Sequence, residues 1–254
     1  MFHDRKFRMP RIWSNSELKK YAQIFSGSVV NVSGWKDIDK QGKKYQEYFI
    51  NAQNYEISNY KSEKKGLQGL KNEFYLDLTD DLNNSLIGKY DVVFNHTTLE
   101  HIYNVKKAFK NLCLLSKDMV IIVVPFLQQM HGNYGDFWRF TPLTVKKLFE
   151  ENGLKLLYLS FNNHKKTSIY IFAIGSKFPE KWNNKISYKF DYKCKKKYFD
   201  EFPNYIGCNA IPNPLIYIIK ERIRKILRKI LRRKKKKNNK YAFVARKLLK
   251  RAKL

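Results

Sequence analysis

Short hydrophobic runs alternate with stretches of helical spacing along most of the chain. The runs predict strands at residues 28–32, 53–58, 73–78, 90–95 and 119–126. The last run, MVIIVVPF, is apolar and rich in β-branched residues, which is the composition of a central parallel strand. Val105, Phe109 and Leu112 share one face of a helix predicted over 102–115. This alternation predicts a doubly wound α/β domain with a mostly parallel sheet.

Local signals predict three further helices and a closing hairpin. Ser14 and Glu17 form a capping-box pattern, which predicts that a helix begins at residue 14. A Lys-rich stretch that contains residues 45–49 is also predicted to be helical. A third helix is predicted over 143–152, between a Thr-Pro pair and a glycine. Two more apolar runs flank NNHKKT and predict an antiparallel hairpin over residues 154–161 and 168–175.

Changes in composition predict three regions. The α/β pattern ends near Lys177, so we expect residues 1–177 to form one domain. Residues 178–213 are aromatic, basic and irregular, and they hold three of the seven prolines, which is typical of a connector. Residues 214–254 are predicted to be a basic, amphipathic helical tail. Its first aliphatic stripe consists of Ile219, Ile223, Ile226, Leu227, Ile230 and Leu231.

The charge of the chain is concentrated in this tail. Lys and Arg total 51 against 22 Asp and Glu, a net charge of +29 with His neutral. Residues 220–254 hold 18 Lys or Arg and one acid, a net of +17, which leaves +12 for the first 219 residues. The tail is therefore predicted to bind an anionic membrane surface through residues 215–254. Nucleic-acid binding through phosphate contacts, and a solvated helix packed on the domain, are the alternatives.

The remaining composition indicates a cytoplasmic protein. No run of 18 apolar residues is present, and the first 13 residues lack the apolar segment of a secretory signal. Cys113, Cys194 and Cys208 lie far apart, so we expect neither a disulfide framework nor a metal-ligand pair. Together with the basic tail, this composition predicts a cytoplasmic location at the inner face of the membrane. No bound metal is expected.

Three segments resemble a known family. They are, in order, YDVVFNHTTLEHIYNVKKAFKNL, MVIIVVPF and HGNYGDFWRFTP. They resemble class I S-adenosylmethionine-dependent methyltransferases, and most closely the branch that acts in bacterial surface-glycan biosynthesis, over about residues 10–176. The resemblance implies a Rossmann-like, seven-stranded sheet with a terminal antiparallel hairpin. It also implies S-adenosylmethionine as cofactor and methyl transfer to a glycan or lipid-linked sugar acceptor at the cytoplasmic membrane face.

Ligands of open α/β sheets bind at the carboxyl ends of the strands, and polar residues stand at the ends of the predicted strands here. The resemblance implies which of these residues bind the cofactor. Asn31 stands where the family has an acid at the end of the first strand. Ser33 and Gly34 then form the loop that approaches the methionine part of the cofactor. The missing acid removes a partner for the positive groups of the cofactor.

The other strand ends supply the remaining cofactor-binding residues that the resemblance implies. Glu56 is expected to hold the ribose hydroxyls, because a carboxylate accepts two hydroxyl protons at once. Asp77 is expected to accept a hydrogen bond from the adenine amino group. Asn95 and His96 close the fourth strand and are expected to lie along the cofactor.

The loop after the fifth strand is expected to line the acceptor pocket, with His131, Asp136 and Arg139 as the candidate catalytic residues. A sugar hydroxyl is a poor nucleophile, and His131 is suited to act as its general base near neutral pH. Arg139 is expected to bind a phosphate or carboxylate of the acceptor, and Trp138 to stack on a sugar. Alternatively, Asp136 and Arg139 pair with each other and brace the loop.

The Leu-Glu-His turn at Glu100 and His101 leaves a structural and a catalytic role open, because a glutamate near a helix N-terminus is stabilised by the helix dipole in any case.

Two other functions also remain open for the whole chain. The loss of the acid at Asn31 suits a degenerate, non-catalytic binding module with a methyltransferase fold. The basic charge suits a methyltransferase directed at nucleic acid.

Overall fold

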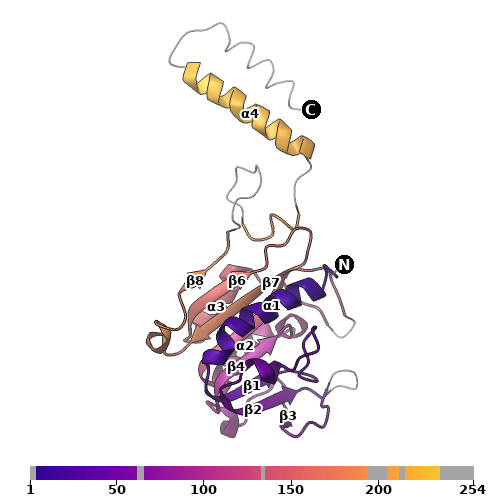
Figure 1. The fold of residues 1–254 in the computed structure, drawn as a ribbon, viewed down its shortest axis with the longest axis vertical. Coiled ribbons are helices and arrows are strands. Elements are labelled where there is room, and N and C mark those ends of the chain that lie inside the picture. The colour runs from indigo at the N-terminus through magenta and orange to yellow at the C-terminus, as the bar shows by residue number, and fades with distance from the viewer. Residues whose placement is uncertain (1–3, 62–65, 133–134, 194–204, 212–214, 235–254) are drawn as a thin grey trace. The chain divides into compact units, whose positions relative to one another are not determined.

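The computed structural model describes residues 4–61, 66–132, 135–193, 205–211 and 215–234. These residues form two compact units (Figure 1). The first contains the sheet and its covering helices, together with Tyr205–Ala210. The second contains helix α4 (Leu215–Lys234) and is described by itself below. The first unit extends past residue 177, since Lys189 and Phe190 add a short strand to the sheet.

The first unit is built on one mixed sheet of eight strands. Their order across the sheet is β3-β2-β1-β4-β5-β7-β6-β8, and β7 runs antiparallel to β5 and to β6 while the other pairs are parallel. The strands are β1 (Gly27–Val32), β2 (Ala52–Asn59), β3 (Glu73–Tyr75), β4 (Tyr90–His96), β5 (Ser116–Leu127), β6 (Lys155–Phe161), β7 (Ile169–Ser176) and β8 (Lys189–Phe190).

This architecture confirms the predicted doubly wound α/β class and the closing hairpin of β6 and β7. The predicted central strand, β5, is buried from Met119 to Pro125, between a parallel neighbour and an antiparallel one. The eighth strand was not predicted, because two residues are too short to carry a periodic signal.

Helices cover both faces of the sheet (Figure 1). One core lies under α2 (Val105–Leu115) and α3 (Pro142–Glu151), where Phe109 and Phe149 pack edge to face. The other core lies under α1 (Arg8–Tyr21), which buries Leu18. The short 3₁₀ turns are η1 (Ala22–Ile24), η2 (Tyr45–Tyr48), η3 (Asn84–Leu86), η4 (Leu99–His101) and η5 (Pro179–Trp182).

Two sequence-based predictions of helices were wrong in detail. Helix α1 begins at Arg8, so Ser14 lies inside the helix rather than capping it. The hydroxyl of Ser14 donates to the carbonyl of Arg11 and lies 2.9 Å from Nε2 of His96, which explains why a capping residue is buried there. The stretch around Tyr45 forms only the turn η2. The Tyr45 ring packs into the core against Phe94.

Helix α4 is an amphipathic helix of 20 residues. Six of its described aliphatic side chains are exposed and Leu227 is half-buried, and basic side chains lie among them. The exposed ones are Leu215, Ile216, Ile219, Ile223, Ile226 and Ile230. Among the residues that the structure describes, no helix is both long and apolar enough to cross a membrane.

Candidate functional site

A cavity of about 510 Å³ opens where the strand order reverses, at the carboxyl ends of β1 and β4. The parallel register pairs Asn31 of β1 with Phe94 of β4 and with Ile57 of β2, so these strands end at a common edge. The cavity is lined by residues that follow four strands, by η4 and by α1. The polar ones are Arg11, Asn31, Ser33, Tyr45, Asn59, Tyr60, Asp77, Thr79, His96, Thr97, Thr98, His101 and Tyr103.

The loop after β1 turns sharply over Asn31. Ser33 and Trp35 have left-handed backbone conformations, with φ of 58° and 50°, which few non-glycine residues adopt. A Cβ atom on Gly34 would lie 2.6 Å from Nδ2 of Asn31, so only glycine lets the backbone pass this closely. The loop thus keeps the close approach that the sequence predicted, with one glycine in place of several.

An acid does stand near the first strand end, behind Asn31 rather than in its place. The Asn31 amide donates to Oδ1 of Asp37 at 2.8 Å, and the hydroxyl of Tyr55 donates to the same atom at 2.7 Å. Asp37 is 2% exposed, and burial raises the pKa of its carboxyl group. Asn31, Asp37 and Tyr55 therefore form a buried polar cluster beneath the loop, with Asp37 as the shared acceptor.

Glu56 does not line the cavity, which corrects its expected role as the ribose ligand. It lies in the middle of β2, three residues before the strand ends at Asn59. Its carboxylate accepts hydrogen bonds from Lys89 at 2.8 Å and from Tyr90 at 2.5 Å, at the beginning of β4. The residue at the true strand end is Asn59, whose side chain bonds the backbone N–H and carbonyl of Trp35. Glu56 is thus engaged away from the carboxyl edge.

Asp77 lines the cavity on the loop after β3, as expected. One of its oxygens accepts from the backbone N–H and the hydroxyl of Thr79, both at 2.7 Å. The second oxygen has no hydrogen bond to any described residue. The carboxylate is therefore oriented by the turn and presents an acceptor to the cavity.

Asn95 and His96 have different surroundings although they are neighbours at the end of β4. Asn95 is fully buried outside the cavity lining, and its amide donates to the carbonyl of Val32. It therefore ties β4 to β1 rather than contacting a ligand. His96 lines the cavity, and burial lowers its pKa well below the usual value, so the ring is neutral. Thr97 follows with a left-handed φ of 49°, a strained conformation for a β-branched residue.

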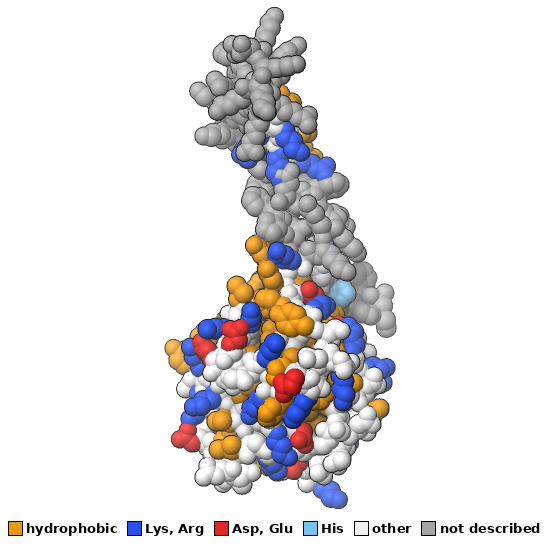
Figure 2. All heavy atoms as spheres, turned by 90° about the vertical axis from the view of Figure 1, so that its left-hand side faces the viewer, with side chains coloured by type: hydrophobic (Ala, Val, Ile, Leu, Met, Phe, Trp, Pro, Cys, Tyr) orange, Lys and Arg blue, Asp and Glu red, His pale blue; other side chains and the backbone are white. Residues whose placement is uncertain are grey.

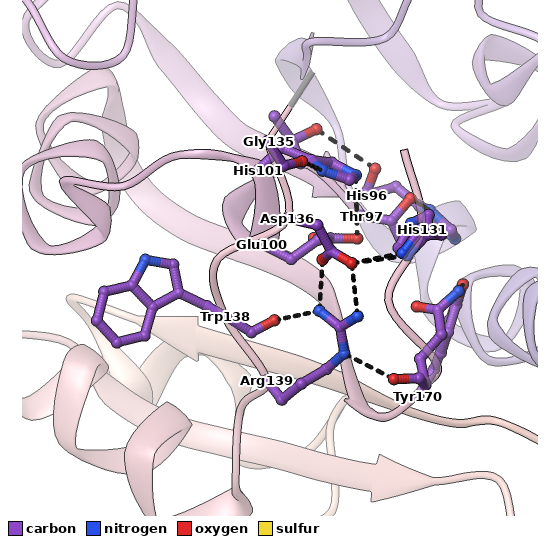
Figure 3. A network of polar contacts seen from close by, with 12 residues as sticks. His96, Thr97, Glu100, His101, His131, Gly135, Asp136, Trp138, Arg139 and Tyr170 are labelled. Carbon is purple, nitrogen blue, oxygen red and sulfur yellow. Dashed lines mark hydrogen bonds and ion pairs between the residues drawn. The ribbon is translucent and has the colours of Figure 1, made fainter. Parts of the chain in front are cut away.

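Asp136 and Arg139 brace the loop after β5, which corrects their expected catalytic role (Figure 3). The guanidinium binds both carboxylate oxygens of Asp136, at 2.5 and 2.8 Å. Its remaining N–H groups donate to the carbonyls of Gln128, Gln129 and Trp138. Arg139 lowers the pKa of Asp136 to about 2. This pair matches the alternative that the two residues hold the loop, and it leaves no donor of Arg139 aimed at an acceptor.

His131 lies beside this pair but is not on the cavity wall. Its backbone N–H donates to Asp136 at 2.7 Å, and its Nδ1 lies 3.4 Å from the same carboxylate. Burial lowers the pKa of the ring, so it is neutral near pH 7. His101, which does line the cavity, packs against His131 with the two ring centroids 5.1 Å apart. The imidazole that faces the cavity is thus His101.

The turn η4 adds a buried acid that the sequence left undecided. Glu100 is 0% exposed, and neither carboxylate oxygen has a hydrogen-bond partner among the described residues. Burial raises its pKa to about 7. Its backbone carbonyl accepts from the N–H groups of Phe137 and Trp138, so the turn also anchors the loop after β5. The sequence offered a signal for this site, the adjacent Glu-His pair, but not its burial.

Arg11 and an aromatic group complete the site, and sequence reasoning missed Arg11 entirely. Arg11 reaches the cavity from α1 and donates to the hydroxyl of Thr97. Tyr103 lines the mouth and packs edge to face on Phe137. The indole N–H of Trp138 donates to the carbonyl of Tyr103. Tyr103, Phe137 and Trp138 are all exposed and form an aromatic rim.

The sequence matches no protein-family model and no curated protein. Solved structures do match the fold. A chain of the complex between the Haloferax volcanii Trm112 methyltransferase activator and a protein named as a methyltransferase aligns with a TM-score of 0.50. It has 10% identity and covers 66% of this chain and 90% of that one.

Two further alignments are to proteins from Burkholderia thailandensis. The first is 1,6-didemethyltoxoflavin-N1-methyltransferase, solved with S-adenosylhomocysteine, with a TM-score of 0.48, 10% identity and coverage of 67% and 79%. The second is an O-methyltransferase family protein, with a TM-score of 0.47, 13% identity and coverage of 67% and 56%. The first unit of this chain therefore has the Rossmann-like fold of class I S-adenosylmethionine-dependent methyltransferases.

Proposed function

We propose that this chain is an S-adenosylmethionine-dependent methyltransferase that acts on a glycan or glycan precursor at the cytoplasmic membrane face. The cavity at the point where the strand order reverses carries the proposal, because open α/β sheets bind their ligands there. Its volume of about 510 Å³ lies within the range of small-molecule sites.

The residues of this cavity fit the cofactor. Gly34 leaves the backbone of the β1 loop open to close approach, since a Cβ there would collide with Asn31. Asp77 presents a carboxylate oxygen to a donor such as an exocyclic amine, and Leu76, Leu78 and Ile102 supply apolar wall for a purine. When bound, the cofactor supplies an electrophilic methyl group on a sulfonium centre.

The contribution of the chain to methyl transfer is mainly to position the two reactants. The β1 loop and Asp77 hold one side of the cavity, and the turn η4 with His101 forms the other side. Aligning a nucleophile with a methyl group converts a bimolecular step into one within a complex. No general base is assigned to His131, because it does not line the cavity.

Two observations favour a sugar acceptor near a membrane. The exposed rim of Tyr103, Phe137 and Trp138 offers aromatic faces of the kind that stack on sugar rings. Helix α4 carries exposed Ile side chains among arginines and lysines, the composition of helices that lie on anionic bilayers. On the face of the first unit shown in Figure 2, Lys and Arg are mixed with Asp and Glu rather than gathered into one patch.

The cofactor part of the proposal is tested by calorimetry with S-adenosylhomocysteine. We expect binding below millimolar concentrations; no binding at millimolar ligand would exclude the methyltransferase activity and favour a non-catalytic binding module. The acceptor is tested by transfer of a radioactive methyl group from S-adenosylmethionine to glycan and lipid-linked sugar fractions, with nucleic acid as the comparison substrate.

The membrane part is tested by co-sedimentation with anionic vesicles and with RNA across a salt series. The full chain should bind vesicles and keep part of that binding at high salt, because burial of the Ile and Leu side chains is not screened. Binding of RNA alone, which collapses with salt, would instead support the nucleic-acid-directed alternative.

A further inference from the structure

A buried carboxylate and two imidazoles converge beside the cavity (Figure 3). Glu100 and His101 come from the turn η4, and His131 comes from the loop after β5. One potential ligand atom from each residue lies within 4.8 Å of the other two. Nε2 of His101 lies 3.9 Å from Oε1 of Glu100.

Glu100 makes the cluster unusual, because its carboxylate is fully buried without any hydrogen bond from a described residue. Buried polar groups are nearly always paired, and a buried acid without a partner calls for an explanation such as a bound ion. Nδ1 of His131 is also buried without a hydrogen-bond partner among the described residues. Both orphaned groups belong to the same cluster.

The orientation of His101 independently suits a metal ligand. Its Nδ1 lies 2.5 Å from the carbonyl of Gly135, which fixes that nitrogen as the donor. Nε2, on the side of Glu100, then carries a lone pair. Histidine ligands commonly have this arrangement, in which the second ring nitrogen donates to a backbone carbonyl or carboxylate.

We propose that Glu100, His101 and His131 bind one divalent transition-metal ion such as Zn²⁺. Two imidazoles and one carboxylate leave coordination positions open for water or substrate. An ion about 2.1 Å from each ligand places the ligand atoms roughly 3–3.5 Å apart. The three atoms lie within 4.8 Å of one another in this structure, so the side chains must move together by about 1 Å when the ion binds. The charge of Arg139 is balanced by Asp136, which leaves Arg11 as the cation facing the acid.

The position of the cluster connects it with the proposed methyl transfer, and this step rests on that proposed function. His101 lines the cavity, so an ion bound to it can polarise an acceptor hydroxyl there. The O–H bond of the acceptor breaks and its proton goes to solvent. The oxygen forms a bond to the methyl carbon as the carbon–sulfur bond breaks, which leaves a neutral thioether. The ion thus takes over the activation of the acceptor that the sequence assigned to His131.

Metal binding is testable without cofactor or acceptor. The full chain is stripped with a chelator and titrated with Zn²⁺, and bound metal is counted after equilibrium dialysis. We expect one tightly bound Zn²⁺ per chain and at least about 100-fold weaker binding in Glu100→Gln and in His131→Ala, because each removes a ligand. The control is His164→Ala, an exposed histidine between β6 and β7, which should bind like the parent.

X-ray absorption of the zinc-loaded parent protein tests the ligands even where a variant fails to fold. Scattering from imidazole and oxygen supports the cluster, whereas sulfur ligands would place the ion at cysteines and overturn the proposal. Equal affinity in the parent and in both folded variants would overturn it as well. Because S-adenosylhomocysteine binding is measured separately, loss of the metal site and loss of the proposed function give different results.

Discussion

Replacing Arg139 with alanine should destabilise the loop after β5 without touching the cavity. The guanidinium makes five hydrogen bonds, two to Asp136 and three to backbone carbonyls. The substitution removes both hydrogen bonds from the guanidinium to the carboxylate of Asp136, whose side chain is 0% exposed. The carboxylate keeps the hydrogen bond from the backbone N–H of His131. A buried charge is then left without its counter-charge.

The magnitude follows from that burial. Breaking a buried ion pair by removing one partner costs about 3–5 kcal/mol. The Arg139 side chain is 25% exposed, so water can partly solvate the remaining acid, and we expect the lower end, about 3 kcal/mol. For a chain of this size, each kcal/mol shifts Tm by roughly 2–4 °C, so the expected decrease is about 6–12 °C.

The assay is thermal unfolding followed by circular dichroism, with Lys146→Ala as the matched control. Lys146 pairs with Glu150 across 3.7 Å on the surface, and such pairs contribute about 0.2–1 kcal/mol. Combining Arg139→Ala with Asp136→Asn should cost less than the sum of the two single changes, because neutralising the acid removes the unpaired charge. A Tm decrease no larger than that of the control would refute the bracing role and restore Arg139 as a candidate acceptor ligand.

Four further outcomes follow from the site and the core. Gly34→Ala should weaken S-adenosylhomocysteine binding at least about 5-fold in calorimetry, because the added Cβ collides with Asn31 and such overpacking costs about 1–3 kcal/mol. Glu56→Gln should leave that affinity unchanged, since its carboxylate is engaged outside the cavity; a large loss would contradict this placement. Burial opposes the hydrogen bonds to this carboxylate, but they lower the pKa of Glu56 overall. The ionised carboxylate therefore stabilises the fold at neutral pH, and this contribution is lost as the pH falls and the carboxylate is protonated. In urea unfolding, the free energy of unfolding of the parent should show this loss at acidic pH, and that of Glu56→Gln should not. Burial raises the pKa of Cys113 to about 12, so peptide mapping should find it unalkylated at pH 7 in the native protein and alkylated in urea.

The sequence identified most of the fold because its strands carry strong local signals. The apolar run of β5 and the alternation with α2 and α3 follow from burial patterns that each segment shows by itself. The start of helix α1 was predicted too late because serine commonly caps helices. The Ser14 hydroxyl instead contacts His96, which is distant in the sequence. A long-range contact of this kind leaves no periodic trace in the sequence.

The candidate site was only partly predictable, for the same physical reason. Asn31, Gly34 and Asp77, which the resemblance implied as cofactor-binding residues, do line the cavity, because they lie at or shortly after the ends of strands and parallel strands bring such positions to one edge. The sequence alone therefore determined the fold class and the edge of the sheet where the cavity lies. Asp136 and Arg139 are only three residues apart, so the sequence already allowed their pairing, and the tertiary structure decided between pairing and acceptor binding. Only the tertiary structure showed that Glu100 is buried beside two imidazoles, because His131 comes from a segment about 30 residues away.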